Sequence, residues 1–184
     1  MSELDELREV QTASREIFDG KIMHVFEDTV RLPDGNAATR EYMRHIGAVC
    51  VIPVLENGDV LVERQYRYPV GQVLTEIPAG KLDSRDEDRL LAAQRELREE
   101  TGAEAGEWTS LGLFYPACAY SDEAIEMFLA RGIRFGERHL DKDEFLNVTR
   151  MPLAVLLEAV MAGEVPDAKT QIAVLKAARL LGLR

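Results

Sequence analysis

The feature that most constrains this chain is a glutamate-rich segment without glycine or proline. Residues 84–101 are rich in leucine, alanine, arginine and glutamate, which predicts a helix over this range. We expect Ser84 and Glu87 to form a capping box at its start, and Gly102 to end it at the C′ position. At about 100° per residue, three glutamates fall within an arc of about 100° beside the apolar stripe of the helix. These are Glu96, Glu99 and Glu100.

Three carboxylates beside the face of a helix that packs on a sheet are energetically unfavourable. Like charges four residues apart destabilise a helix by a few tenths of a kcal/mol, and partial burial adds a desolvation cost. A divalent cation would relieve both effects. Mg²⁺ suits the pattern because it takes one or two carboxylates and keeps positions for water and substrate phosphates. The alternative is a solvated acidic helix face with Arg95 and Arg98 as ion-pair partners.

The rest of the chain predicts a mixed α/β or α+β domain, in which helices pack on a mixed sheet. Turn signals occur at Asp19-Gly20 and at Asn57-Gly58, the latter being the strongest hairpin signal in the chain. Helices 152–162 and 167–181 close the chain, with Asp167 as the N-cap of the second. Strands are predicted at 15–18, 22–30, 39–45, 47–55, 60–66, 73–77, 108–115 and 124–130.

Composition excludes several classes of protein. No apolar run approaches the roughly 18 residues of a membrane span. The N-terminus is acidic without an apolar stretch, so we expect no signal peptide. Cys50 and Cys118 do not make a disulfide framework, and a cytoplasmic protein is the expectation. The net charge of −11, from 22 Lys and Arg against 33 Asp and Glu, disfavours general nucleic-acid binding. An acidic protein that acts on a phosphate substrate needs metal cations and a few placed arginines.

The segment from Gly80 to Ala103 resembles the signature of the Nudix hydrolases, which is a glycine, a glutamate, and then Arg-Glu-aliphatic-x-Glu-Glu-x-Gly-aliphatic. Six residues separate Gly80 from Glu87, one more than in the family pattern. We interpret this as an insertion in the loop 82–86, with Glu87 in register on the helix. The positions that match the Nudix signature are Gly80, Glu87, Arg95, Glu96, Leu97, Glu99, Glu100 and Gly102, with Ala103 at the last apolar place. The flanking residues 63–67 and 76–82 resemble the ADP-ribose pyrophosphatase branch of the family.

The resemblance implies a metal site and a catalytic set. Metal ions would be held by Glu96, Glu100 and the backbone carbonyl of Ala79, with Glu99 assisting. Glu99 and Arg95 also belong to the implied catalytic set. The alternative role for Glu99 is that of an ion-pair partner of Arg95 four residues earlier.

The same branch implies a general base on a loop after the glutamate-rich helix. The acidic loop 140–146 is the matching place, and we expect Glu144 to be the base. Asp143 and Asp141 are rivals, and Glu123 in another loop is a weaker one. A base on a loop acts once the loop closes over the substrate.

The resemblance also implies residues that bind the substrate. Arg67 would contact a phosphate, Glu76 would accept a hydrogen bond from the ribose or base, and Tyr42 would stack on adenine, with Arg40 beside it. The alternatives are a surface arginine, a simple strand carboxylate and an ordinary half-buried strand tyrosine.

The resemblance implies a Nudix fold, which is a mixed sheet sandwiched between helices, with an N-terminal antiparallel strand extension. The expected activity is Mg²⁺-dependent hydrolysis of ADP-ribose, or a related ADP-sugar, to AMP and a sugar phosphate, with Mn²⁺ as a substitute ion. The alternatives are another nucleoside-diphosphate sugar such as GDP-mannose, a dinucleoside polyphosphate, or a non-catalytic module that binds ADP-ribose. The resemblance also implies a homodimer that exchanges residues 1–45, with a Nudix domain over 46–184. Strand edges that would otherwise lie unpaired give a physical motive for the dimer.

Overall fold

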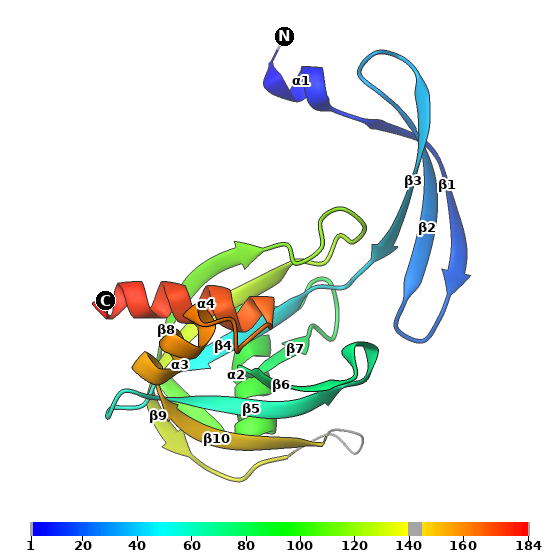
Figure 1. Ribbon diagram of the computed structural model, residues 1–184. Helices are drawn as coiled ribbons and strands as arrows, with labels where there is room; N and C mark the ends of the chain where they lie inside the picture. Colours follow the sequence, from blue (N-terminus) through cyan, green and yellow to red (C-terminus); the bar gives the residue numbers. More distant parts are fainter. Residues whose placement is uncertain (1, 140–144, 184) are drawn as a thin grey trace. The chain divides into compact units, whose positions relative to one another are not determined.

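The computed structural model describes residues 2–139 and 145–183. The chain divides into two compact units (Figure 1). The first unit comprises Met1–His45 and Ala117–Glu123, and the second comprises Ile46–Pro116 and Ala124–Arg184.

The first unit is a three-stranded antiparallel sheet in the order β1-β2-β3, preceded by a short helix. This confirms the predicted N-terminal strand extension. The segment Ala117–Glu123 adds to the edge of the sheet, since the Met43 N–H donates to the Tyr120 carbonyl at 2.9 Å. The elements are α1 (Glu3–Leu7), β1 (Val10–Asp19), β2 (His24–Arg31) and β3 (Ala37–Arg44).

The second unit holds two sheets, ordered β7-β4-β9-β8 and β10-β5-β6. Strands β4 and β9 are parallel, and the other pairs in these sheets are antiparallel. The strands are β4 (Ala48–Pro53), β5 (Asp59–Arg67), β6 (Gln72–Glu76), β7 (Ala79–Lys81), β8 (Ala103–Phe114), β9 (Ile125–Phe135) and β10 (Leu146–Pro152). The helices are η1 (Tyr68–Val70), α2 (Arg89–Thr101), α3 (Leu153–Met161) and α4 (Ala168–Leu180).

Strand β4 divides its side chains between two hydrophobic cores. Cys50 and Ile52 pack in the core that includes α3 and α4, whereas Val49 and Val51 pack in the core that includes α2. All four are fully buried, as expected of a strand covered on both faces. Helix α2 therefore lies on one face and α3 with α4 on the other (Figure 1). The predicted sheet between helices is confirmed.

The predicted hairpin at Asn57-Gly58 is confirmed at its tip, but its two strands do not continue as a pair. The turn forms, with the Leu55 N–H donating to the Asp59 carbonyl at 2.8 Å, but β4 and β5 belong to different sheets. Only an isolated bridge, Val54 to Val60, joins them. The physical reason is that β7 and β9 occupy the two edges of β4, so β5 pairs with β6 and β10 instead.

Other strands also differ from the prediction, and the closing helices agree with it. Strand β7 was not predicted, and β1 and β8 each begin five residues before their predicted starts. Strand β10 was not predicted, and it lies at a sheet edge, where Leu146 is its one buried residue. Strand β9 extends to Phe135, five residues beyond the predicted end. The Asp167 side chain caps α4, as predicted, by accepting from the Thr170 N–H. Within residues 2–139 and 145–183, no helix has the length and apolar character that a membrane crossing requires.

Candidate active site

Gly80 lies where the backbone of β7 meets the Glu96 carboxylate of α2. A Cβ atom at position 80 would lie 2.0 Å from the Glu96 carboxyl carbon, and 2.1 and 2.2 Å from its two oxygens. Real Cβ atoms essentially never approach so closely. Glycine at position 80 therefore lets the carboxylate rest directly against the strand, and this explains its place in the motif.

Glu100 approaches the same strand one residue earlier. Its Oε2 accepts a hydrogen bond of 2.9 Å from the Ala79 N–H. Both glutamates are buried, since Glu96 is 9% exposed and Glu100 is 4% exposed. The structure thus brings together Ala79, Glu96 and Glu100, the three residues implied as metal ligands.

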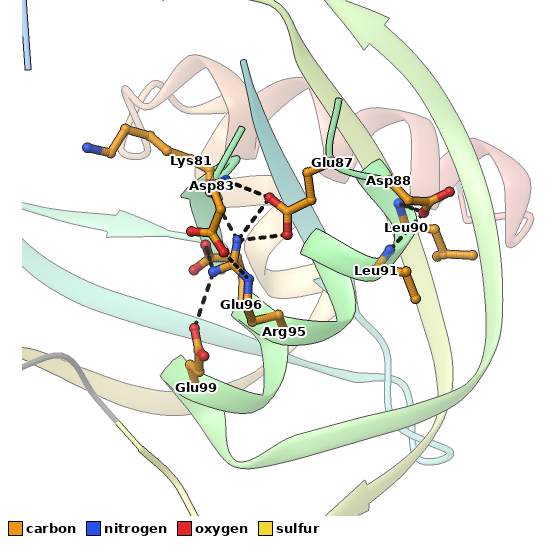
Figure 2. Close-up of polar contacts among 9 residues, drawn as sticks. All are labelled: Lys81, Asp83, Glu87, Asp88, Leu90, Leu91, Arg95, Glu96 and Glu99. Atoms are coloured by element: carbon orange, nitrogen blue, oxygen red, sulfur yellow. Dashed lines mark hydrogen bonds and ion pairs between the residues drawn. The ribbon is translucent and has the colours of Figure 1, made fainter. Parts of the chain in front are cut away.

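Arg95 holds the carboxylates around it in place (Figure 2). Its Nη1 donates to Glu96 at 2.8 Å and to Glu99 at 3.4 Å, and its Nη2 donates to the Lys81 carbonyl at 3.2 Å. Burial alone would lower the pKa of Arg95, but the charges of Glu96, Asp83 and the other nearby carboxylates raise it above its ordinary value. Glu99 is thus the ion-pair partner of Arg95 that the helical spacing allowed.

The start of α2 differs from the prediction. The helix begins at Arg89 rather than at residue 84, and Asp88 caps it by accepting from the Leu90 and Leu91 N–H groups at 2.9 and 3.0 Å (Figure 2). The capping box of Ser84 with Glu87 is therefore wrong.

Glu87 lies in the loop before α2 and not on the helix, which corrects the predicted register. Its carboxylate accepts from the Asp83 N–H at 2.6 Å and so closes the loop on itself. It still reaches Arg95, whose Nη2 lies 3.4 Å from Oε1. The extra residue before Glu87 is therefore absorbed in the loop, while the contact between Glu87 and Arg95 is kept.

Arg67 and Glu76 form a bidentate pair at the ends of the paired strands β5 and β6. Arg67 Nε donates to Glu76 Oε1 at 2.7 Å, and Nη2 donates to Oε2 at 2.8 Å. The Glu76 hydrogen bonds, together with the charges of Glu76, Asp167 and Glu100, raise the pKa of Arg67. The Glu76 carboxylate therefore occupies one edge of the Arg67 guanidinium.

Lys169 is a member of this site that the sequence reasoning missed. Its Nζ donates to Glu76 Oε2 and, at 3.0 Å, to Asp167 Oδ1. Burial would raise the pKa of Glu76, but hydrogen bonds and charges from Arg67 and Lys169 outweigh it and lower the pKa. A lysine in the first turn of a predicted helix was the available signal, because a cation is unfavourable at a helix N-terminus and so indicates a tertiary partner.

Tyr42 and Arg40 belong to the first unit, where each already has polar partners. Arg40 forms a bidentate pair with Glu9. The Tyr42 hydroxyl donates to Asp28 at 3.0 Å and accepts from Arg44 at 2.9 Å. Their contacts to a nucleotide stay a prediction.

The predicted base, Glu144, lies outside the described residues, as do its rivals Asp141 and Asp143. On one side of this loop, the His139 N–H donates to the Glu99 carbonyl at 3.2 Å. Glu123, the other candidate, belongs to the first unit, where its Oε1 lies 3.8 Å from His45 Nδ1.

The donor set fits a hard divalent cation. Glu96 and Glu100 offer buried carboxylate oxygens beside the backbone of Ala79. The missing side chain of Gly80 leaves room for the Glu96 carboxylate. Oxygen ligands of this kind suit Mg²⁺ or Mn²⁺ rather than metals that prefer sulfur or imidazole. The arrangement can thus hold cations beside an arginine, which is the combination needed to bind a diphosphate.

Comparisons with known proteins show which family and which relatives this chain resembles. Residues 43–172 match the NUDIX domain, and residues 10–43 match the nucleoside diphosphate sugar hydrolase N-terminal domain. The ADP-ribose pyrophosphatase of Bacillus subtilis is 39% identical over 170 residues, covering 91% of each chain. The methanol dehydrogenase activator of Bacillus methanolicus is 36% identical, covering 95% of this chain and 94% of that protein.

A solved structure shares the fold. The crystal structure of an ADP compounds hydrolase matches with a TM-score of 0.85 at 21% identity, and the match covers 95% of both chains. The domain match over residues 43–172 and the 39% identity to a relative over 91% of this chain establish the family. The chain belongs to the Nudix hydrolases.

Proposed function

We propose that this chain hydrolyses the pyrophosphate bond of ADP-ribose, or of a related ADP-sugar, to AMP and a sugar phosphate with Mg²⁺ as cofactor. The observation that carries the proposal is the pair of buried carboxylates, Glu96 and Glu100, packed on the backbone of β7. The similarity to an ADP-ribose pyrophosphatase over 91% of the chain supports the choice of substrate.

The residues around α2 have separate roles in the proposed hydrolysis. Glu96, Glu100 and the Ala79 carbonyl would hold the cations, which supply charge neutralisation and acidify a water molecule. Arg95 keeps the carboxylates of Glu96 and Glu99 oriented through its hydrogen bonds of 2.8 and 3.4 Å. Other groups must bind the diphosphate and accept the proton of the attacking water.

Two further residues complete the proposed mechanism. Arg67 binds the diphosphate, because a guanidinium presents paired donors that match phosphate oxygens. Glu144 accepts the proton of the attacking water, as a positioned carboxylate on a loop can do. Glu76 holds Arg67 at the edge of the site through the bidentate pair.

The test is a panel of nucleoside-diphosphate compounds with Mg²⁺, read by the phosphomonoester released. We expect ADP-ribose to be the preferred substrate and Glu100→Gln to abolish nearly all turnover. Glu104→Gln, an exposed change on β8, is the matched control and keeps wild-type turnover. Wild-type turnover in folded Glu100→Gln would contradict the metal assignment.

A second candidate keeps the reaction and changes the substrate to another nucleoside-diphosphate sugar, such as GDP-mannose. The match of residues 10–43 to the N-terminal domain of nucleoside diphosphate sugar hydrolases favours it. The same panel separates the two, because preferential turnover of GDP-mannose would displace ADP-ribose. A non-catalytic binding module is disfavoured, since binding alone does not need the crowded carboxylates Glu96, Glu99 and Glu100.

We also propose that the protein is a homodimer that exchanges residues 1–45 and works in the cytoplasm. Strand β1 lies at the edge of its sheet and is exposed along its whole length. Apolar side chains near its end are exposed, including Phe18 at 56% and Ile22 at 57%. Two free cysteines, Cys50 and Cys118, are compatible with a reducing compartment. A monomeric mass in sedimentation at micromolar concentration would refute the dimer.

A further inference from the structure

The pairing of Arg67 with Glu76 leaves a defined edge of the guanidinium available. Glu76 takes the Nε and Nη2 donors, at 2.7 and 2.8 Å. A guanidinium has five N–H donors in one plane. Among the described residues, the hydrogen bonds of Arg67 use only this one edge, so the edge formed by Nη1 and Nη2 points away from Glu76. The Arg67 side chain is 42% exposed, so this second edge can reach a phosphate group.

The direction of that edge depends on how firmly Glu76 is held. The Glu76 side chain is buried, since the residue is 2% exposed. A carboxylate that has a cation on one side only is free to rotate toward that cation. Lys169 contacts the Oε2 atom that also accepts from Arg67 Nη2. Asp167 in turn holds the lysine, with Oδ1 at 3.0 Å from Nζ. The carboxylate of Glu76 is therefore hydrogen-bonded by two cations, Arg67 from β5 and Lys169 from α4.

A second buried carboxylate lies close to Glu76. Glu63, also buried at 3% exposure, lies directly opposite Glu76 in the pairing of β5 with β6. Side chains of directly opposite residues in an antiparallel pair lie on the same face and close together. Two buried carboxylates therefore lie close together on this surface, which raises the electrostatic cost of keeping Glu76 ionised and makes its contact with Lys169 more important.

We propose that Lys169 is a positioning residue for hydrolysis: by holding Glu76 it fixes the orientation of Arg67, so that the Nη1 and Nη2 edge meets the diphosphate. Lys169 acts through Glu76 rather than on the substrate. Its side chain is only 11% exposed, and its ammonium group already lies between Glu76 and Asp167. This inference rests on the proposed function, because it takes Arg67 as the group that binds the diphosphate.

The first experiment measures steady-state kinetics with ADP-ribose and Mg²⁺ for Lys169→Met, which keeps the length and removes the charge. We expect KM to rise by about tenfold, the effect of weakening one charge-assisted hydrogen bond, with kcat within about threefold of wild type. Lys169→Arg restores the cation and brings KM back toward wild type. Lys176→Met is the matched control, because this lysine is on the same helix but donates to the Leu111 carbonyl. An unchanged KM in Lys169→Met would overturn the proposal.

The second experiment distinguishes positioning from direct contact with substrate. In a Glu76→Gln background the proposed route is already broken, so adding Lys169→Met should raise KM by less than about twofold. A lysine that touches the substrate would show its full effect in both backgrounds. That result would assign Lys169 a direct contact and refute the positioning role.

The third measurement needs no turnover. Hydrogen exchange of the Arg67 Nε–H, followed by NMR, reports whether the bidentate pair is ordered. We expect exchange to accelerate at least about tenfold in Lys169→Met and to stay at the wild-type rate in Lys176→Met. Unchanged exchange in folded Lys169→Met would refute the inference even if KM rises. If the wild-type protein hydrolyses no compound in the panel, the proposed function fails, whereas this measurement still decides whether Lys169 orders Arg67.

Discussion

Replacing Gly80 with alanine tests whether the motif glycine exists to seat the Glu96 carboxylate. The new Cβ would lie 2.0 Å from the Glu96 carboxyl carbon, and ordinary van der Waals contact begins at 3.4 Å. The carboxyl group must therefore retreat by about 1.4 Å to reach a favourable separation. Mg²⁺ holds its ligands at roughly 2.0–2.1 Å in nearly ideal octahedral geometry, so a shift of this size removes Glu96 from the ion.

The same change should have little effect on folding. Gly80 is not among the glycines with positive φ, so its backbone conformation accepts alanine. The atoms that must move are the far end of one side chain and not the backbone. Alanine also restricts the unfolded chain, so we expect the free energy of unfolding to change by no more than about 1 kcal/mol.

The assay combines Mn²⁺ binding, followed by electron paramagnetic resonance, with urea unfolding in the absence of metal. For Gly80→Ala we expect the Mn²⁺ affinity to fall by at least about tenfold, on the scale seen when the surroundings of a metal ligand are disturbed. Gly106→Ala is the matched control, because the nearest atom to its added Cβ is 3.8 Å away. Wild-type Mn²⁺ affinity in folded Gly80→Ala would refute this reasoning. Loss of the fold would refute the claim that only a side-chain end must move.

Three further changes test other parts of the site. Asp88→Ala removes the cap of α2 and should lower the free energy of unfolding by about 0.5–2 kcal/mol in urea titrations; no change would show that the cap does not matter. Glu144→Gln should lower kcat by about 10²–10⁴-fold, whereas a large loss in Glu123→Gln alone would place the base elsewhere. The lowered pKa of Glu76 means that its ionised form stabilises the fold above the ordinary carboxyl pKa, and that this stability is lost as the pH falls through the lowered value. Thermal unfolding of Glu76→Gln should therefore differ most from wild type at neutral pH and least in acid; a difference independent of pH would contradict the ion pair with Arg67.

The start of α2 shows where sequence reasoning lost accuracy. Residues 84–88 have helical composition, and the spacing of Ser84 and Glu87 matches a capping box. In the structure the Glu87 carboxylate instead bonds the Asp83 N–H and Arg95, so Asp88 takes the capping position. Arg95 lies further along the helix, and its hydrogen bond to the Glu87 carboxylate competes with use of that carboxylate as a local cap. Local propensity could not decide between these two uses of Glu87.

The turn at Asn57-Gly58 shows a second limit. The dipeptide correctly marked a tight turn, since turn chemistry depends on the few residues within it. Whether the flanking strands pair with each other depends on competing edges, and β4 has both of its edges occupied by β7 and β9. Strand pairing is a property of the whole sheet, which no short pattern contains.

The sequence by itself determined the carboxylate ridge of α2. Residues three and four apart on a helix share a face, so Glu96 and Glu100 had to lie together beside the apolar stripe once the helix formed. Only the tertiary structure decided what surrounds them. Lys169 meets Glu76 across 93 positions of sequence, and the Gly80 backbone meets Glu96 because β7 packs beside α2. Contacts of this kind arise from the packing of separate elements, and helical or strand periodicity carries no information about which elements will meet.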